Sequence, residues 1–386
     1  MRKPITIGDL GTIITGKTPP TTNKNYYGDY AVFIKPTDIS EQCKFTYETE
    51  EMYSKLAAEK YESSLIPKGA ICVPCIGTIG TKMTMAPCNC YTNQSINSIV
   101  CGENYDNEYV YYLIKNFLPG IKAYNLGTAS GREYVSKSNF EKIELVAEQD
   151  INIQKRIGVI LSRYDSLIEN YQKQIKLLEE AAQRLYKEWF VDLHFPGHEN
   201  TKIVDGVPEG WEKKPVDSIY SIKYGKNLST KLISESGEFP VYGANGVIGY
   251  YDKANCNEQV VLITSRGNGS GDVLMTYHKD TFITNNSFIV SPLEDYSYCQ
   301  LPFTYQFLKN ANFRAVRTGA AQPQLTNQSI HTVDVVLPTQ KLISAYCKKS
   351  IYNNESIIYL KNQIRLLTEA RDRLLPKLMS GEIKVS

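Results

Sequence analysis

The sequence predicts an α+β fold: two similar domains of mixed β structure with short helices, separated by two long helices that pair as an antiparallel coiled coil. Three observations predict it. The chain of 386 residues contains a tandem repeat, short apolar runs fill most of each repeat, and each repeat ends in a long apolar stripe at helical spacing. The expected segments are domains at 1–150 and 191–338 (with a connector at 191–211), and helices at 151–190 and 339–386.

The repeat is clearest in the two helical segments. Residues 174–185 and 363–374 are identical at eight of twelve positions, at an offset of 189. Shorter matches occur at similar offsets, such as Thr92-Asn93-Gln94-Ser95 with Thr284-Asn285-Asn286-Ser287 at 192, and residues 111–116 with 305–310 at 194. Because several matches keep the same order, they indicate a tandem duplication.

Each domain is predicted to consist of short strands and one short helix. Gly, Pro, Asn and Asp clusters bound the apolar runs, which is typical of strands. The segment from Trp189 to Trp211 is rich in aromatic residues, Pro and Gly, so we expect a connector docked on the fold. The predicted strands are 30–34, 69–73, 96–100, 259–263 and 287–290, and the predicted short helices are 107–116 and 298–310.

Apolar residues recur every three or four positions through both helical segments. Each helix could run for about 35 residues, or about 50 Å. Pro338 precedes the second helix, and Pro376 with Gly381 is expected to mark its end. A helix packed only on its own domain is the alternative, but so long a stripe favours a coiled coil. The residues expected in this coiled coil or in partner binding are Ile157, Tyr164, Leu167, Tyr171, Ile175, Leu178, Leu185, Ile357, Leu360, Ile364, Leu367 and Leu374.

Composition favours a soluble cytoplasmic protein. No run reaches the roughly 18 apolar residues of a membrane span, and the first residues lack the apolar core of a signal peptide. The nine cysteines are scattered, which fits reduced thiols better than a disulfide framework.

Charge is distributed unevenly along the chain. The net charge is −2 over residues 1–150 and −3 over 191–335, but +2 over 151–190 and +5 over 336–386. Nucleic acid would therefore have to be bound by local cationic clusters or with help from partner subunits. We expect the chain alone to bind DNA weakly.

The sequence lacks the motifs of enzymes that modify DNA. It contains no Asn/Asp-Pro-Pro-Tyr/Phe motif, which an adenine methyltransferase needs to hold a flipped base, and no Walker loop. Residues 267–271 (Gly-Asn-Gly-Ser-Gly) are predicted to form a turn, with a DNA-facing tip as the functional alternative. Cys72, Cys75, Cys88 and Cys90 are expected to be free thiols, with a zinc site as the alternative. We expect no catalytic residue and no metal.

Four segments, spread over essentially the whole chain, carry a resemblance to a known family. They are residues 16–19 with 33–39, the connector 189–197 with 208–211, residues 240–249, and residues 374–383. In this order they resemble the specificity (S) subunit of type I restriction-modification systems. The sequence departs from that family before each helix, where residues 145–149 and 337–340 are reduced forms of its Pro-Pro-x-x-Glu-Gln segment.

The resemblance implies a subunit that recognises DNA sequence and is not itself an enzyme. Each target recognition domain would read one half of a bipartite DNA site, and the helices would act as the spacer. Two modification subunits would bind the helices and methylate adenines, and two restriction subunits would join them where present. S-adenosylmethionine, ATP and Mg are expected in these partners and none in this chain. Because the two domains differ, the site is expected to be asymmetric.

Two other functions stay open from the sequence. One is a diverged single-chain DNA methyltransferase, and the other is a coiled-coil scaffold unrelated to DNA. Transfer of methyl groups by the chain alone would favour the first. Sequence-specific protection that survives an exchange of half-domains would favour the second.

Arg, Lys, Asn and Gln in loops are the residue types that form bidentate hydrogen bonds with purine edges. The run from 309 to 325 holds three cations and no acid, which makes it the best single patch. Each of these residues could equally be a solvated surface group. The residues expected to bind DNA are Lys17, Lys82, Lys122 and Arg132 in the first domain and Lys226, Arg266, Asn268, Lys309, Arg314, Arg317, Gln322 and Gln324 in the second.

Overall fold

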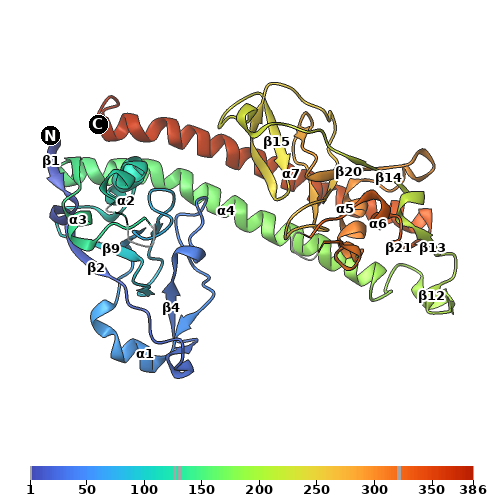
Figure 1. Cartoon of the computed structure of the whole chain (residues 1–386), viewed down its shortest axis with the longest axis horizontal. Helices are drawn as coiled ribbons and strands as arrows, with labels where there is room; N and C mark the ends of the chain where they lie inside the picture. The colour runs from blue at the N-terminus through green and yellow to red at the C-terminus, as the bar shows by residue number, and fades with distance from the viewer. Residues whose placement is uncertain (1, 126, 128–132, 320–322, 386) are drawn as a thin grey trace. The chain divides into compact units, whose positions relative to one another are not determined.

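The computed structural model describes residues 2–125, 127, 133–319 and 323–385. The chain divides into two compact units, Met1–Asn170 with Gln363–Ser386 and Tyr171–Asn362. Each unit contains a β-rich domain and about half of each long helix (Figure 1). Across the described ranges, no helix combines the length and the apolarity needed to cross a bilayer.

The first unit contains two four-stranded sheets. One is antiparallel, in the order β2-β9-β6-β7, and the other, β3-β5-β4-β8, ends in a parallel pair between β4 and β8. β1 pairs with β10, so the start of the domain lies beside its end. The elements are β1 (Arg2–Thr6), β2 (Gly11–Thr15), β3 (Tyr27–Gly28), β4 (Ala31–Ile34), β5 (Met52–Tyr53), α1 (Lys55–Lys60), β6 (Ile71–Pro74), β7 (Thr84–Met85), β8 (Tyr91–Thr92), β9 (Ile96–Cys101), α2 (Asn107–Phe117), α3 (Lys137–Glu141), β10 (Glu144–Glu148) and the start of α4 (Ile151–Phe190).

The second unit repeats this plan. Its sheet β14-β20-β17-β18 has the order of β2-β9-β6-β7, β15 pairs in parallel with β19 as β4 does with β8, and β13 pairs with β21 as β1 does with β10. The tandem duplication predicted from the sequence is therefore visible in the strand order. The elements are β11 (Ile203–Val204), β12 (Val207–Pro208), β13 (Glu212–Pro215), β14 (Tyr220–Tyr224), β15 (Phe239–Gly243), β16 (Gly246–Tyr251), β17 (Val261–Thr264), β18 (Val273–Met275), β19 (Phe282–Ile283), β20 (Ser287–Pro292), α5 (Leu301–Asn310), α6 (Asn327–Ile330), β21 (Asp334–Leu337) and α7 (Gln340–Ser380).

The helices α4 and α7 pair in antiparallel fashion, as predicted. In the first unit, Asp165 of α4 accepts a hydrogen bond from Arg371 of α7. In the second unit, Lys361 of α7 lies 3.6 Å from Glu179 of α4, and the Tyr346 hydroxyl donates to the Ala182 carbonyl at 3.3 Å. The residue numbers of the contacting side chains therefore increase along α4 while they decrease along α7, as in an antiparallel pair.

Each domain buries its apolar side chains against the beginning of one helix and the end of the other. The core of the first unit includes Ile157 and Leu161 from α4 with Leu375 and Leu378 from α7. The core of the second includes Tyr186, Trp189 and Phe190 from α4 with Ile343 and Tyr346 from α7. The helices are therefore part of both cores.

The prediction that Pro376 helps to end the second helix is wrong. α7 continues through Pro376 to Ser380, and Gly381 follows with a φ of 82°, a backbone conformation that favours glycine. A proline removes one backbone donor, but Leu375, Leu378 and Met379 are buried in the core and hold the last turn in place.

The connector after α4 is docked on the second domain, as its composition predicts. Phe195 is buried, and its ring centroid lies 5.5 Å from that of Trp211. Trp211 in turn lies 6.0 Å from Phe190, at the end of α4. This aromatic contact fixes the chain where it leaves the helix.

Candidate nucleic-acid interface

In the second unit, two loops that lie far apart in the sequence form one surface. The Gly267 amide donates to the Pro323 carbonyl at 3.0 Å, and the Leu325 amide donates to the Ser265 carbonyl at 2.7 Å. Between these bonds, Arg266 and Gln324 are paired across an antiparallel bridge. The Gly-rich turn after β17 is therefore held against the segment that follows α5.

Five predicted residues lie together on this surface. Arg266, Asn268 and Gln324 are exposed, and Arg317 Nη1 lies 3.4 Å from the Asn268 carbonyl to which it donates. Arg314 donates from Nε to Asp272 Oδ1 at 2.9 Å. Because the side chains of Arg314 and Asp272 are 58% and 39% exposed, this pair is weak and can open toward a ligand.

Lys226 is connected to the same surface through hydrogen bonds of Asn285. The Asn285 amide donates to the Lys226 carbonyl at 3.0 Å, and the Ser265 hydroxyl donates to the Asn285 carbonyl at 3.1 Å. These two hydrogen bonds connect Lys226 with the turn that carries Arg266. Lys309 lies on the last turn of α5, with its Nζ 5.5 Å from the Tyr305 ring centre.

Sequence reasoning missed two polar neighbours of this surface. Asp272 pairs with Arg314, and Asn245, in the turn between β15 and β16, lies close to Gly269, where an added Cβ would be 3.2 Å from its Oδ1. The Asn245-Gly246 pair is a hairpin-turn signal that could have located Asn245.

The first unit forms the equivalent surface with the same backbone bonds. The Gly77 amide donates to the Glu133 carbonyl at 3.1 Å, the Val135 amide donates to the Cys75 carbonyl at 2.9 Å, and Ile76 bridges Tyr134. These bonds correspond one for one to those of Gly267, Leu325 and Arg266. The duplication therefore extends to the loops.

Of the cations predicted for the first unit, Lys122 and Lys82 lie at the Gly77–Gly80 turn of this surface. Lys122 is exposed and its stem packs against Gly80, where an added Cβ would be 3.0 Å from Cγ. The Lys17 amide donates to the Thr92 carbonyl at 3.0 Å, and its Nζ donates to the Ser63 hydroxyl at 3.4 Å. Lys82 is half-buried just after the Gly77–Gly80 turn. Arg132 and Gln322 lie outside the described residues.

The two surfaces share a scaffold and differ in the side chains they present. Where the second unit pairs Arg266 with Gln324, the first pairs Ile76 with Tyr134. Guanidinium and amide groups suit purine edges, whereas apolar and aromatic groups suit thymine methyl groups and base faces. The two units therefore present chemically different surfaces on the same backbone scaffold.

Three of the four cysteines considered for a zinc site are buried. Cys72, Cys75 and Cys90 are buried and Cys88 is exposed. Burial raises the pKa of Cys72 to about 11 and that of Cys75 to about 12, so both thiols are protonated at neutral pH. Within the part of the chain that the structure describes, no cluster of His, Cys, Asp or Glu is arranged to hold a metal ion.

All but one of the residues predicted for the coiled coil are buried or half-buried, and Leu167 is the exception. Leu167 is 43% exposed, whereas its neighbours Asp165 and Ile168 are buried. The buried members of the predicted set are Ile157, Ile175, Ile357 and Leu360, and the half-buried members are Tyr164, Tyr171, Leu178, Leu185, Ile364, Leu367 and Leu374.

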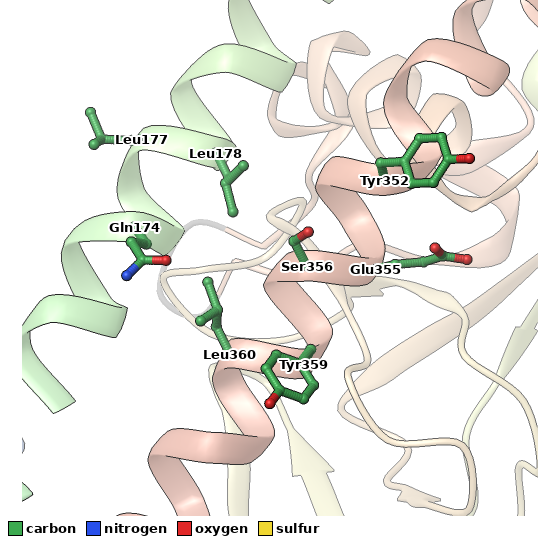
Figure 2. Close-up of a pocket in the computed structure, with 8 residues that line it drawn as sticks. All are labelled: Gln174, Leu177, Leu178, Tyr352, Glu355, Ser356, Tyr359 and Leu360. Atoms are coloured by element: carbon green, nitrogen blue, oxygen red, sulfur yellow. The ribbon is translucent and has the colours of Figure 1, made fainter. Parts of the chain in front are cut away.

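A groove of about 700 Å³ lies between α4 and α7 in the second unit. In Figure 2, Leu178 of α4 and Leu360 of α7 point into the space between the helices. Leu177, Tyr352 and Tyr359, which also line the groove, are 64%, 74% and 62% exposed. Large apolar and aromatic side chains exposed together are typical of a protein-binding surface.

The helix pair in the first unit is joined by a buried polar network. The Tyr112 hydroxyl of α2 donates to Asp165 Oδ2 at 2.5 Å, and Arg371 Nη1 donates to the other carboxylate oxygen. Burial lowers the pKa of Arg371, but Asp165 and Asp372 together outweigh this effect and hold the pKa above its ordinary value. This network ties the first domain to both helices.

Comparison with known proteins agrees with this arrangement. The family model of the type I restriction modification DNA specificity domain matches twice, over residues 3–180 and 208–366. The MjaIX specificity subunit of Methanocaldococcus jannaschii is 25% identical over 98% of this chain and 93% of its own length. The HindI specificity subunit of Haemophilus influenzae is 34% identical over 45% of this chain and 38% of its own.

A solved structure shares the fold. The S subunit of a type I restriction-modification system from M. genitalium superposes with a TM-score of 0.60 at 19% identity, covering 98% of this chain and 96% of that one. Two recognition domains, each carrying the same loop surface, and two antiparallel helices thus occur in a chain whose sequence matches the family twice. The chain belongs to the type I restriction-modification specificity subunits.

Proposed function

We propose that this chain reads a bipartite, asymmetric DNA site, one half with each recognition domain, and positions methyltransferase subunits on it. One observation carries the proposal. The same loop scaffold is present in both domains but presents Arg266 and Gln324 in one and Ile76 and Tyr134 in the other. Equivalent surfaces with different side chains are what two different half-sites require.

The groove between α4 and α7 is the surface we assign to a methyltransferase subunit. Its exposed Tyr352 and Tyr359 are of the residue type that most often anchors protein interfaces. The helices carry the net positive charge of the chain, at +2 over 151–190 and +5 over 336–386, so an acidic partner surface is favoured. Restriction subunits would join where the system retains them.

The proposal assigns no catalytic step to this chain. S-adenosylmethionine would be bound by the methyltransferase subunits, and ATP and Mg by restriction subunits. What this chain supplies is the choice of site and the geometry in which the partners meet the DNA. The matched relatives are named as specificity subunits, which supports this division.

A genome-wide map of adenine methylation, in strains with and without the gene, tests the proposal. We expect deletion to remove methylation from one bipartite motif with unlike halves and to leave all other motifs unchanged. Loss of a motif with identical halves would contradict the asymmetric site. If the map does not change, co-purification with a methyltransferase subunit decides whether the system is silent.

A second assay separates this function from a single-chain methyltransferase. The purified chain is incubated with radiolabelled S-adenosylmethionine and DNA containing the mapped motif, alone and with the methyltransferase subunit. We expect label in the DNA only with the partner present. Transfer by the chain alone would contradict the proposal.

A further inference from the structure

The buried ion pair between Asp165 and Arg371 has no counterpart in the second unit. Both side chains are almost fully buried, at 6% and 8% exposure. At the repeat offset of 189, Asp165 corresponds to Asn354, and Arg371 corresponds to Ala182. The first repeat therefore supplies only the carboxylate, and the second repeat supplies only the guanidinium.

The correspondence holds in space as well as in sequence. Ala182 and Asn354 line one small cavity of about 30 Å³ in the second unit. Gln306, which corresponds to Tyr112 at the offset of 194, lines the same cavity and is 4% exposed. The second unit thus has neutral side chains at each place where the first unit has a member of the network.

This difference affects which helices can pair. Because the repeats are similar, α4 of one copy could pair with α4 of a second copy about a twofold axis, and α7 with α7 likewise. The first arrangement would place Asp165 against Ala182, and the second would place Arg371 against Asn354. A buried charge left without its partner is strongly destabilising.

Arg371 has one further hydrogen-bond partner, but this partner would not compensate for the loss of Asp165. Asp372 accepts from Arg371 Nε at 2.8 Å, and its side chain is 51% exposed. An exposed carboxylate is screened by water, so it balances the buried guanidinium less well than Asp165 does. Pairing of two α7 helices therefore remains disfavoured, and pairing of two α4 helices would leave Asp165 with the neutral Tyr112 hydroxyl as a hydrogen-bond donor but with no guanidinium.

We propose that the Asp165–Arg371 pair determines helix partnership in this protein, selecting the pairing of a first repeat with a second repeat over the pairing of like repeats. The pair would then determine the specificity of assembly, because it distinguishes between α4 and α7, which are otherwise nearly equivalent helices. The effect is independent of which DNA sequence the domains read.

The test begins with the full chain and cuts it only after folding. A protease site is inserted between Asp205 and Gly206, which are exposed in the turn joining β11 and β12. Cleavage leaves two fragments that carry one repeat each. Native mass spectrometry then measures, after incubation to constant composition, how much material is in unlike pairs and how much is in like pairs.

Two double variants make the two repeats alike at these positions. One variant removes the charged pair, and the other introduces it into both repeats. Asp165→Asn with Arg371→Ala makes both repeats neutral, and Ala182→Arg with Asn354→Asp gives both repeats the charged pair. In the wild type, we expect unlike pairs to exceed like pairs by roughly 100-fold or more. In either variant, we expect the unlike fraction to fall toward about half, the value for random pairing.

The outcomes decide the proposal. Redistribution into like pairs in every variant that folds, while the wild type remains in unlike pairs, supports the proposal. A wild type that redistributes overturns it, and so does a folded variant that stays entirely in unlike pairs. Because the two variants change buried charge in opposite directions, failure of one to fold leaves the other to decide.

Discussion

The cationic side chains of the loops differ in how readily they could contact DNA. Arg314 and Arg266 are both exposed, but Arg314 forms an ion pair with Asp272, whereas Arg266 lies opposite Gln324 in an antiparallel bridge. An arginine beside an amide can contact a purine edge through two donors while the amide contacts the neighbouring base. Arg266 is therefore the side chain we expect to contribute most to the choice of one half-site.

Arg266→Ala should weaken binding of the assembled complex to its own target by about 1–3 kcal/mol, or roughly 5- to 150-fold. Fluorescence anisotropy on duplexes with the mapped motif measures this at fixed salt. Lys202→Ala, an exposed cation outside the loop surface, is the matched control. An equal loss on all duplexes would indicate a phosphate contact instead.

Tyr112→Phe removes one donor from the buried Asp165 carboxylate. Since the oxygen left without a hydrogen bond is desolvated, we expect the free energy of unfolding of the first unit to fall by about 1–3 kcal/mol. Hydrogen exchange of α2 amides reports this unit separately. Tyr30→Phe, at a side chain 61% exposed, should change it little, and an equal effect of both variants would contradict the role of Asp165.

Thiol reactivity should follow burial. At pH 8 the raised pKa values of Cys72 and Cys75, about 11 and about 12, leave almost no thiolate, whereas Cys88 is exposed. Iodoacetamide should therefore modify Cys88 first, and the buried pair only after unfolding, as measured by peptide mapping. Comparable rates at all three thiols in the folded protein would be incompatible with this arrangement.

At the scale of elements, the long helices were predictable in extent but not in detail. The 3–4 spacing of apolar residues predicts helices over 151–190 and 339–386, and the structure has them at Ile151–Phe190 and Gln340–Ser380. A search for apolar residues selects Leu167 and passes over Asp165 and Arg371, because nothing in one sequence shows that two distant charges meet. The loop surfaces were predictable only as residue types, since the bonds between distant loops depend on the folded sheets.

Insertion of four residues after Asn170 and four after Asn362 lengthens each helix by about one turn, or about 5.4 Å. If the helices are the spacer, the gap between the half-sites should grow by roughly one to two base pairs at 3.4 Å each. The half-site sequences should stay the same. The methylation map measures both, with Asn170→Ala and Asn362→Ala as the control, and a changed half-site sequence would refute the spacer role.

At the scale of the whole molecule, the distribution of net charge indicates that the domains expected to recognise the DNA sequence are not the main source of affinity for DNA. The regions containing the recognition domains are net negative, at −2 and −3, and the helical regions are net positive. Because affinity for DNA comes largely from neutralising phosphates, a reader with acidic domains depends on partners for much of its binding.

The isolated chain should therefore bind its target only at micromolar concentrations or weaker at physiological salt, and the complex should bind far more tightly. Titration of labelled duplex with the chain, with and without the methyltransferase subunit, measures the difference. A scrambled duplex is the control. Nanomolar, sequence-specific binding by the chain alone would contradict this expectation.

The bonds that hold the recognition loops also determine how readily this protein can evolve. Val135 and Leu325 fix the loops through backbone amides, which every residue type except proline provides, whereas Gly77 and Gly267 have φ values of 81° and 84° that favour glycine. Exposed side chains between these bonds can therefore change with little cost to the stability of the fold. If these loops read DNA as proposed, new targets can arise by substitution at the loop tips, while the sheets beneath them stay as they are.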